Sequence, residues 1–170
     1  MLLRGKASVA LAMAAICLLP AAATAQRRVP LPSPMPPVVY APCPDDPTVE
    51  GCTYWVAPFT IYLSNHRRFI REHELGHAFD QTMMSDGERN RFRTLTHQRT
   101  APWWKLEEGE YSRASVGEQF ADAYANCAIG NGSRRLPSGM ISDRWETSTS
   151  YSPSPRTHRR VCAFIRRAAR

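Results

Sequence analysis

Five consecutive residues, His73-Glu74-Leu75-Gly76-His77, form the pattern HExxH. On a helix, residues four apart lie on the same face one turn from each other, so His73 and His77 can direct two imidazoles at one metal ion. Glu74 lies about 100° round the helix from His73, within reach of a water bound to that ion. Two neutral nitrogen ligands and a carboxylate that accepts a proton from the water are what Zn²⁺-dependent hydrolysis requires.

The same pattern can also arise by chance on an exposed helix with a polar face. Apolar residues flank it at helical spacing, which predicts a helix over residues 66–82 that is at least partly buried. These apolar residues are Phe69, Ile70, Leu75, Ala78 and Phe79. Because unpaired polar groups are costly in a buried helix, we interpret His73 and His77 as metal ligands and Glu74 as the general base.

A catalytic zinc needs a third protein ligand and one open position. One common extension of HExxH places Gly and His three and six residues after the second histidine, but this chain has Asp80 and Met83 there. The other route is a glutamate from a later helix, and Glu118 and Asp122 again lie four residues apart on one face. Glu118 can complete the zinc shell, and Asp122 can accept the second N–H of a ligating histidine, with His73 the expected partner. The alternative is that Glu118 is an ordinary surface glutamate.

Residues 111–124, YSRASVGEQFADAY, resemble a motif of the anthrax lethal factor-like peptidases, a group that includes the secreted Pro-Pro endopeptidases. The pattern of that group is Y-x-R-x-x-x-x-E-x-F-A-[DE]-A-[FY]. Its first motif, H-E-x-G-H-A-x-D, matches residues 73–80 throughout. The gap between the two motifs, about forty residues, is also similar, and the resemblance covers roughly residues 55–130.

The resemblance implies a gluzincin-type site in a zincin-like domain, with one Zn²⁺ held by His73, His77 and Glu118. It also implies that Glu74 is the general base and that Tyr111 donates a hydrogen bond to the oxyanion of the tetrahedral intermediate. Spacing alone would leave Tyr111 as a core aromatic. The chain has no room for the separate recognition domains of the large members, so the resemblance does not specify the substrate, and cleavage between prolines is not implied.

Residues 1–25 have the features of a secretory signal: a basic start, a short apolar run and a small-residue cleavage site at residues 23–25. The apolar run is too short to predict a membrane span, and we expect a secreted, extracellular protein. Residues 26–47 contain eight prolines and predict an extended, mostly structureless leader. This leaves residues 48–170 as a single metallopeptidase domain.

Removal of the signal leaves four cysteines, and an even number in an exported chain indicates disulfide bonds. We predict Cys43–Cys52, which closes a short N-terminal loop, and Cys127–Cys162, which joins the Glu118 helix to the C-terminal helix. Two other pairings are possible, and some of these cysteines could instead be free and buried. No two cysteines have the CxxC spacing of a zinc site.

Short β-branched and aromatic runs at residues 53–56 and 59–63 predict two strands directly before the HExxH helix. Ser64 and Asn65 are candidate N-caps for that helix. Residues 59–63 either hold a substrate backbone as an edge strand or form a plain core strand. These elements predict an α+β domain, mainly helical, with a short strand pair bordering the active-site helix.

Three more helices are predicted downstream, over residues 86–98, 115–129 and 157–169. Ser85 and Glu88 have the spacing of a capping box at the start of the first. Gly130 directly follows the second and predicts its end. In the third, we expect His158 to lie on the exposed face.

The chain carries 22 basic and 15 acidic residues, a net charge of +7, which draws an exported protein towards anionic surfaces. The arginines are scattered and form no nucleic-acid motif, so we expect no specific nucleic-acid partner. We expect a monomeric zinc metalloendopeptidase that hydrolyses a protein or peptide substrate, with Zn²⁺ as its one cofactor. The alternatives are a zinc-dependent cell-wall amidase and a catalytically silent peptide-binding or toxin-associated module.

Overall fold

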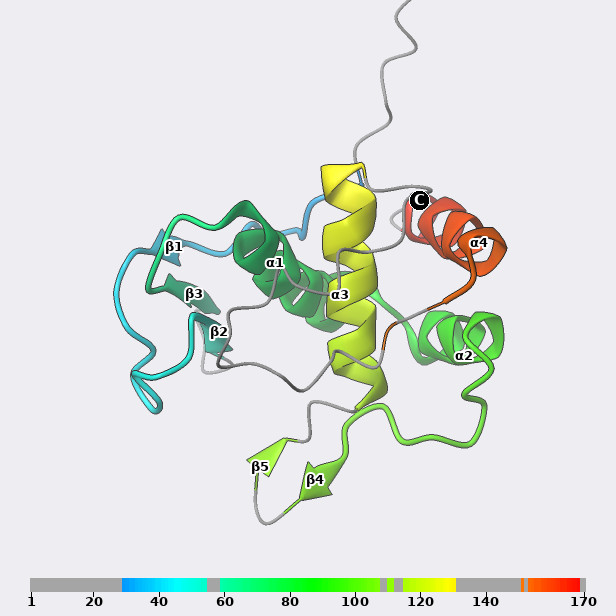
Figure 1. Cartoon of the computed structure of the whole chain (residues 1–170), viewed down its shortest axis with the longest axis horizontal. Helices are drawn as coiled ribbons and strands as arrows, with labels where there is room; N and C mark the ends of the chain where they lie inside the picture. Colours follow the sequence, from blue (N-terminus) through cyan, green and yellow to red (C-terminus); the bar gives the residue numbers. More distant parts are fainter. Residues whose placement is uncertain are drawn as a thin grey trace, which may run out of the picture.

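Two helices, α1 (Arg68–Met83) and α3 (Val116–Ile129), pack against each other at the centre of the computed structural model (Figure 1). The structure describes residues 29–54, 59–107, 110–111, 115–130, 151 and 153–168. A small sheet packs on α1, whereas α2 (Asp86–Leu95) and α4 (Pro155–Ile165) lie together on the other side of α3. The described part of the chain is therefore a small, mixed α+β domain, as the sequence predicted.

The sheet contains three described strands, β1 (Val38–Val39), β2 (Gly51–Tyr54) and β3 (Thr60–Leu63), in the order β1-β3-β2. β3 pairs in parallel with β1 and antiparallel with β2. The predicted strand pair is thus present, although residues 55–58 lie outside the described part. Because β3 has a neighbour on each side, the interpretation of residues 59–63 as a substrate-binding edge strand is wrong. β3 is a core strand, and β2 is the edge strand nearer to α1.

Residues 29–47 pack on the domain. Val29 is buried in the core, and Val38 packs against the core from β1. The Tyr124 hydroxyl of α3 donates a hydrogen bond of 2.6 Å to the Pro30 carbonyl oxygen. The expectation of a mostly structureless leader is therefore wrong for this stretch, because Val29, Val38 and the disulfide-bonded Cys43 attach it to the domain.

The predicted signal peptide, residues 1–25, lies outside the described residues and stays a prediction. None of the described helices combines the length and apolar character that crossing a membrane demands.

Local capping signals fix the helix ends in two of the predicted cases. In α2, the Ser85 hydroxyl accepts from the Glu88 N–H, and the Glu88 carboxylate accepts from the Ser85 N–H, so the capping box is present. α3 ends at Gly130, whose φ of 84° is left-handed. α1 differs from the prediction: its N-cap is Arg67, and the Asn65 side chain instead accepts the Arg67 N–H at 2.9 Å, before the helix begins.

Both predicted disulfide bonds are present, Cys43–Cys52 and Cys127–Cys162. The second joins α3 to α4. The expected exposure of His158 is wrong: its side chain is buried beside this disulfide, and its Nδ1 lies 2.9 Å from the Tyr151 hydroxyl. The face of α4 that carries His158 is the apolar face that packs on the core, and the hydroxyl of Tyr151 gives the buried imidazole a polar partner.

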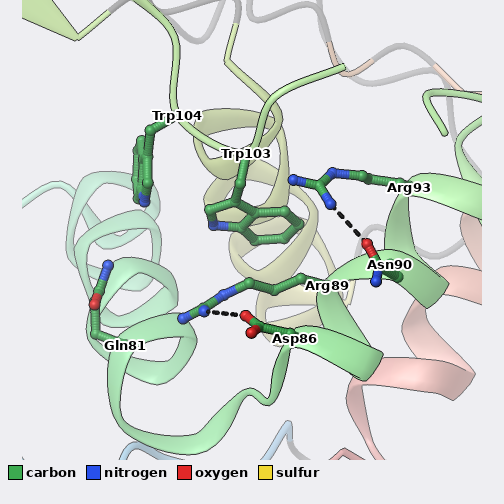
Figure 2. A pocket seen from close by; sticks show the side chains of 7 residues that line it. All are labelled: Gln81, Asp86, Arg89, Asn90, Arg93, Trp103 and Trp104. Carbon is green, nitrogen blue, oxygen red and sulfur yellow. Dashed lines mark hydrogen bonds and ion pairs between the residues drawn. The ribbon is translucent and has the colours of Figure 1, made fainter. Parts of the chain in front are cut away.

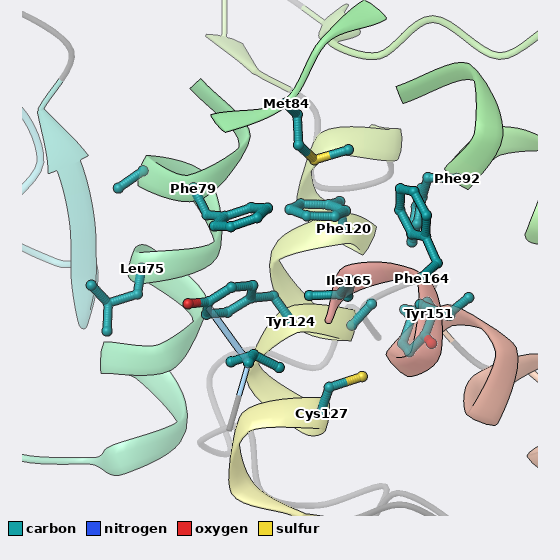
Figure 3. Packing of buried hydrophobic residues seen from close by; sticks show 14 of the residues in the cluster. Leu75, Phe79, Met84, Phe92, Phe120, Tyr124, Cys127, Tyr151, Phe164 and Ile165 are labelled. Atoms are coloured by element: carbon teal, nitrogen blue, oxygen red, sulfur yellow. The ribbon is translucent and has the colours of Figure 1, made fainter. Parts of the chain in front are cut away.

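Aromatic rings fill the core between the helices (Figure 3). Phe79 of α1 lies between two rings of α3, with centroid distances of 6.3 Å to Phe120 and 5.4 Å to Tyr124. Phe92 of α2 meets Phe120 edge-to-face at 5.2 Å. All four rings are fully buried or nearly so. This packing fixes α1 against α3, the two helices that carry the predicted metal ligands.

Candidate metal centre

Three predicted ligands from two helices converge on one point. His73 and His77 of α1 have their Nε2 atoms 3.0 Å apart. The Glu118 carboxylate, in the first turn of α3, lies 3.2 Å from His73 Nε2 and 3.4 Å from His77 Nε2. These ligand atoms lie within 4.8 Å of one another, which is close enough for all three to contact a single ion.

Asp122 lies one helical turn beyond Glu118 on α3. Its Oδ1 lies 2.9 Å from His73 Nδ1, and its side chain is almost completely buried. A carboxylate in this place accepts the Nδ1–H of the imidazole and leaves the Nε2 lone pair directed at the shared point. The structure thus brings Asp122 to His73, the histidine that the sequence indicated.

The charges of the cluster depend on one another. Burial lowers the pKa of His73, but its hydrogen bonds with Asp122 and Glu118 outweigh this, so the pKa is raised well above the usual value. Burial also lowers the pKa of His77, and the Glu118 charge reverses the effect. For Glu118, burial raises the pKa, but the two imidazoles lower it further, so the carboxylate stays ionised. The three side chains therefore stabilise a positive charge between them.

The donor set fits a zinc ion. Two imidazole nitrogens and one carboxylate oxygen are a common ligand set for catalytic Zn²⁺, which leaves a further position for water. The positive charge that the cluster favours can be a proton or a divalent cation. The carboxylate on His73 Nδ1 is the partner that a metal-ligating histidine commonly has. His73, His77 and Glu118 would hold the ion.

A second group of potential ligands lies among the described residues. Sulfur and nitrogen atoms of Cys127, His158 and Cys162 are also within metal-ligand reach of one another. Both cysteines are consumed by the disulfide bond, and a disulfide has no thiolate to offer a metal. His73, His77 and Glu118 therefore form the better candidate.

Glu74 lies on the side of α1 that faces the sheet. It is buried, and the Thr53 hydroxyl of β2 donates a 3.0 Å hydrogen bond to its Oε2. A Cβ on Gly51 would lie 3.2 Å from Glu74 Oε1, so β2 packs directly on the carboxylate. Burial raises the pKa of Glu74, and this effect exceeds the lowering by the two histidines. A carboxylate of raised pKa is a better proton acceptor.

Gly76 sets the distance between the two ligand-bearing helices. A Cβ at this position would lie 2.8 Å from the Cα of Ala121 and 3.1 Å from its carbonyl oxygen. These are backbone atoms of α3, which cannot move aside as a flexible side chain can. Gly76 immediately precedes His77, so the close approach of the helices occurs where Glu118 must reach the histidines.

The two adjacent tryptophans have different roles. Trp103 is buried, and its indole N–H donates a 2.7 Å hydrogen bond to the Asp80 carboxylate. Trp104 lies at the metal centre, with its ring centroid 5.6 Å from that of His77. A Cβ on Gly117 would lie 2.7 Å from the Trp104 ring, so the indole rests on the first turn of α3. Trp104 therefore forms one wall beside the candidate ligand His77.

Asp80 is a buried hydrogen-bond acceptor near the end of α1. It accepts hydrogen bonds of 2.7 Å from Arg89 Nε of α2 and 2.7 Å from Trp103 Nε1. Burial raises the pKa of Asp80, and the hydrogen bond from Arg89 opposes this. The sequence placed Asp80 in the first motif but gave no sign of these partners, which come from other elements.

Tyr111 lies in a short hairpin that precedes α3. The hairpin consists of β4 (Leu106–Glu107) and β5 (Glu110–Tyr111), paired antiparallel with Leu106 opposite Tyr111. The structure describes only the backbone here. The predicted oxyanion contact of the Tyr111 side chain therefore lies outside the described part of the structure.

Comparison with known proteins finds no protein-family model, no curated protein and no solved structure that matches the chain. The likeness to the lethal factor-like peptidases consequently rests on the two sequence motifs.

Proposed function

We propose that the protein is an exported zinc metalloendopeptidase of the gluzincin type, with a zincin-like fold. The convergence of His73, His77 and Glu118 beside a buried Glu74 is the observation that carries this proposal. The HExxH pattern supplies the histidines at the right spacing, and α3 supplies the third ligand together with the carboxylate on His73 Nδ1. The two disulfide bonds support export, because such bonds persist in oxidising compartments.

The bound metal would act as a Lewis acid and lower the pKa of a coordinated water. Glu74 would act as the general base that takes a proton from the attacking water and passes it to the leaving amine. The Thr53 hydroxyl holds the Glu74 carboxylate in place, and Asp122 holds the His73 ring with Nε2 directed at the ion. Tyr111 would donate a hydrogen bond to the oxyanion of the substrate, as the resemblance implies.

The sheet favours an extended peptide as substrate. β2 packs on Glu74 through Gly51 and Thr53, and no described strand pairs with its outer edge. A peptide can add to such an edge through main-chain hydrogen bonds, which would place its backbone next to the general base. The sequence suggested residues 59–63 as the strand that binds the substrate backbone; in our proposal β2 is that strand.

The test combines metal content with cleavage of a peptide library. The purified protein should contain one zinc per chain and cleave peptides. Glu74→Gln should retain the metal and lose activity by roughly 10²–10⁴-fold, the usual contribution of a general base. Glu72→Gln is the matched control, because it makes the same change on the same helix, outside the ligand set.

Each alternative gives a different result in the same experiment. Hydrolysis of peptidoglycan but not of peptides, again dependent on Glu74, would identify a cell-wall amidase. Zinc binding without hydrolysis of either polymer would identify a silent binding module. A protein that binds no zinc would refute the proposed metal centre.

A further inference from the structure

A pocket of 490 Å³ lies between α2, the end of α1 and the two tryptophans (Figure 2). Its lining residues are Gln81, Asp86, Arg89, Asn90, Arg93, Trp103 and Trp104. The Trp104 ring also lies beside that of His77, tilted by 38°, and Gln81 lies one turn beyond His77 on the same face of α1. The pocket and the metal centre therefore share the Trp104 side chain as a wall.

Arg93 lines this pocket, and no described acidic residue forms an ion pair with it. Its Nη1 donates a 2.7 Å hydrogen bond to the neutral Asn90 side chain. Its Nε is buried and has no hydrogen-bond partner in the described structure. Its guanidinium lies 5.6 Å from the centroid of the Trp103 ring, and none of the ion pairs between described residues includes it.

The other arginine of the pocket has acidic partners. Arg89 forms ion pairs of 2.7 Å with the buried Asp80 and 3.1 Å with Asp86. The Asp86 side chain is 94% exposed, and its described ion pair is with Arg89 and not with Arg93. Figure 2 shows the Arg89–Asp86 pair and the Arg93–Asn90 hydrogen bond as separate contacts on α2.

These contacts specify the chemistry of a ligand. Arg93 lines the pocket without a described acidic partner, and a guanidinium presents donors in a plane that matches a carboxylate. The indoles of Trp103 and Trp104 would contact the methylene groups of an acidic side chain. The volume lies within the range of about 300–1,000 Å³ that is usual for small-ligand pockets.

The distance of the pocket from the metal centre predicts which residue of a bound peptide would carry the acidic group. From His77 to Gln81 the helix rises by about 6 Å, whereas an extended peptide advances about 3.3–3.6 Å per residue. A side chain in the pocket would therefore belong to a residue one or two positions from the hydrolysed bond. We propose that the pocket binds an aspartate or glutamate side chain of the substrate, and that Arg93 determines this specificity. The assignment of the pocket as a substrate subsite rests on the proposed peptidase function.

A binding experiment tests the pocket without any need for cleavage. The probes are N-acetylglutamate amide and N-acetylglutamine amide, which differ only in the charge of the side chain. They are titrated into the zinc-loaded protein while NMR follows the Arg93 Nε–H and Trp103 indole signals. The glutamate probe should bind about 10-fold or more tightly than the glutamine probe, since hydrogen bonds to charged groups contribute more than neutral ones.

Three variants assign the preference to one side chain. Arg93→Met should abolish the preference, and Arg93→Lys, which keeps the charge but not the planar donors, should restore part of it. Arg159→Met is the matched control, because it removes the same charge from an exposed position on α4. This control should keep the full preference. In cleavage assays the same preference should appear in kcat/KM for peptides that carry Glu or Gln near the cleaved bond.

The outcomes separate this proposal from the proposed function. Equal affinity for the two probes, no binding of either, or a preference that survives in Arg93→Met would overturn the pocket assignment even if the protein cleaves peptides. An Arg93-dependent preference in a protein that cleaves no peptide would support the acidic-ligand pocket and refute the peptidase.

Discussion

Replacement of Gly76 with alanine tests whether the packing of two helices sets the metal centre. The new Cβ would lie 2.8 Å from the Cα of Ala121, whereas ordinary contact begins at 3.4 Å, so α1 and α3 would have to separate by about 0.6 Å. Overpacking of this kind costs roughly 1–3 kcal/mol. The better helix propensity of alanine offsets about 0.5–1 kcal/mol of that cost. The free energy of unfolding should therefore fall by roughly 0–2.5 kcal/mol.

The effect on the metal should be larger. His77 lies on one helix and Glu118 on the other, and metal–ligand distances tolerate deviations of only about 0.2 Å. A shift of about 0.6 Å exceeds this tolerance. We expect Gly76→Ala to weaken zinc binding roughly 10–100-fold, the range observed when residues that orient the ligands are changed.

The assay measures zinc affinity by competition with a chromophoric chelator, and stability by thermal unfolding with and without EDTA. Gly87→Ala, in α2, is the control: the nearest atom to its new Cβ would be Ser85 Oγ at 3.8 Å, an ordinary contact. This control should leave zinc affinity unchanged and stabilise the fold by up to about 1 kcal/mol. If Gly76→Ala matches the control in both measurements, the spacing of the two helices does not govern the centre.

Three further predictions concern Asp122, the disulfide bond between α3 and α4, and His73. Asp122→Asn should weaken zinc binding roughly 10–100-fold, because His73 loses the carboxylate that fixes its ring; an unchanged affinity in chelator competition would contradict that role. Replacement of Cys127 and Cys162 by serine opens a loop with a sequence separation of 35. It should lower the unfolding free energy by roughly 3–4 kcal/mol in urea denaturation, and a loss under about 1 kcal/mol would show that the covalent link adds little. In the metal-free protein the pKa of His73 is raised, so its protonated form stabilises the fold. That stabilisation is complete below the unfolded pKa of about 6.5 and is lost as pH rises through the folded value. An NMR titration should place the His73 midpoint above 6.5, and a midpoint at or below this value would contradict the contacts described.

Features that depend on nearby residues could be predicted from the sequence. The capping box of Ser85 and Glu88 and the glycine end of α3 each involve residues within one helical turn, so their signal is local. The spacing of His73 and His77 is local for the same reason. Cys43–Cys52 was predicted because it closes a short loop, and Cys127–Cys162 because it joins two expected helices; both bonds are present.

Other features, which depend on distant partners and carry no motif, could not be predicted. Thr53 reaches Glu74 across 21 residues of sequence, and a threonine in a strand carries no sign of such a contact. His158 sits among arginines in the sequence, yet the amphipathic face of α4 buries it. The prolines of residues 29–47 suggested a solvated chain, but part of this stretch packs on the domain. β1 forms because Val38 and Val39 find a partner in β3.

The attachment of residues 29–47 to α3 and β3 sets a limit on proteolytic maturation. A cut after residue 47 would not release this stretch, because the Cys43–Cys52 disulfide bond would still join it to β2. The pairing of β1 with β3 also holds the stretch on the domain, as does the Pro30 carbonyl oxygen, which accepts from Tyr124 two residues beyond Asp122. The proline-rich stretch is therefore unsuited to be a pro-segment whose removal activates the protein. N-terminal sequencing of the folded protein should give a single sequence that begins ahead of Val29, as expected if this stretch is a permanent part of the domain.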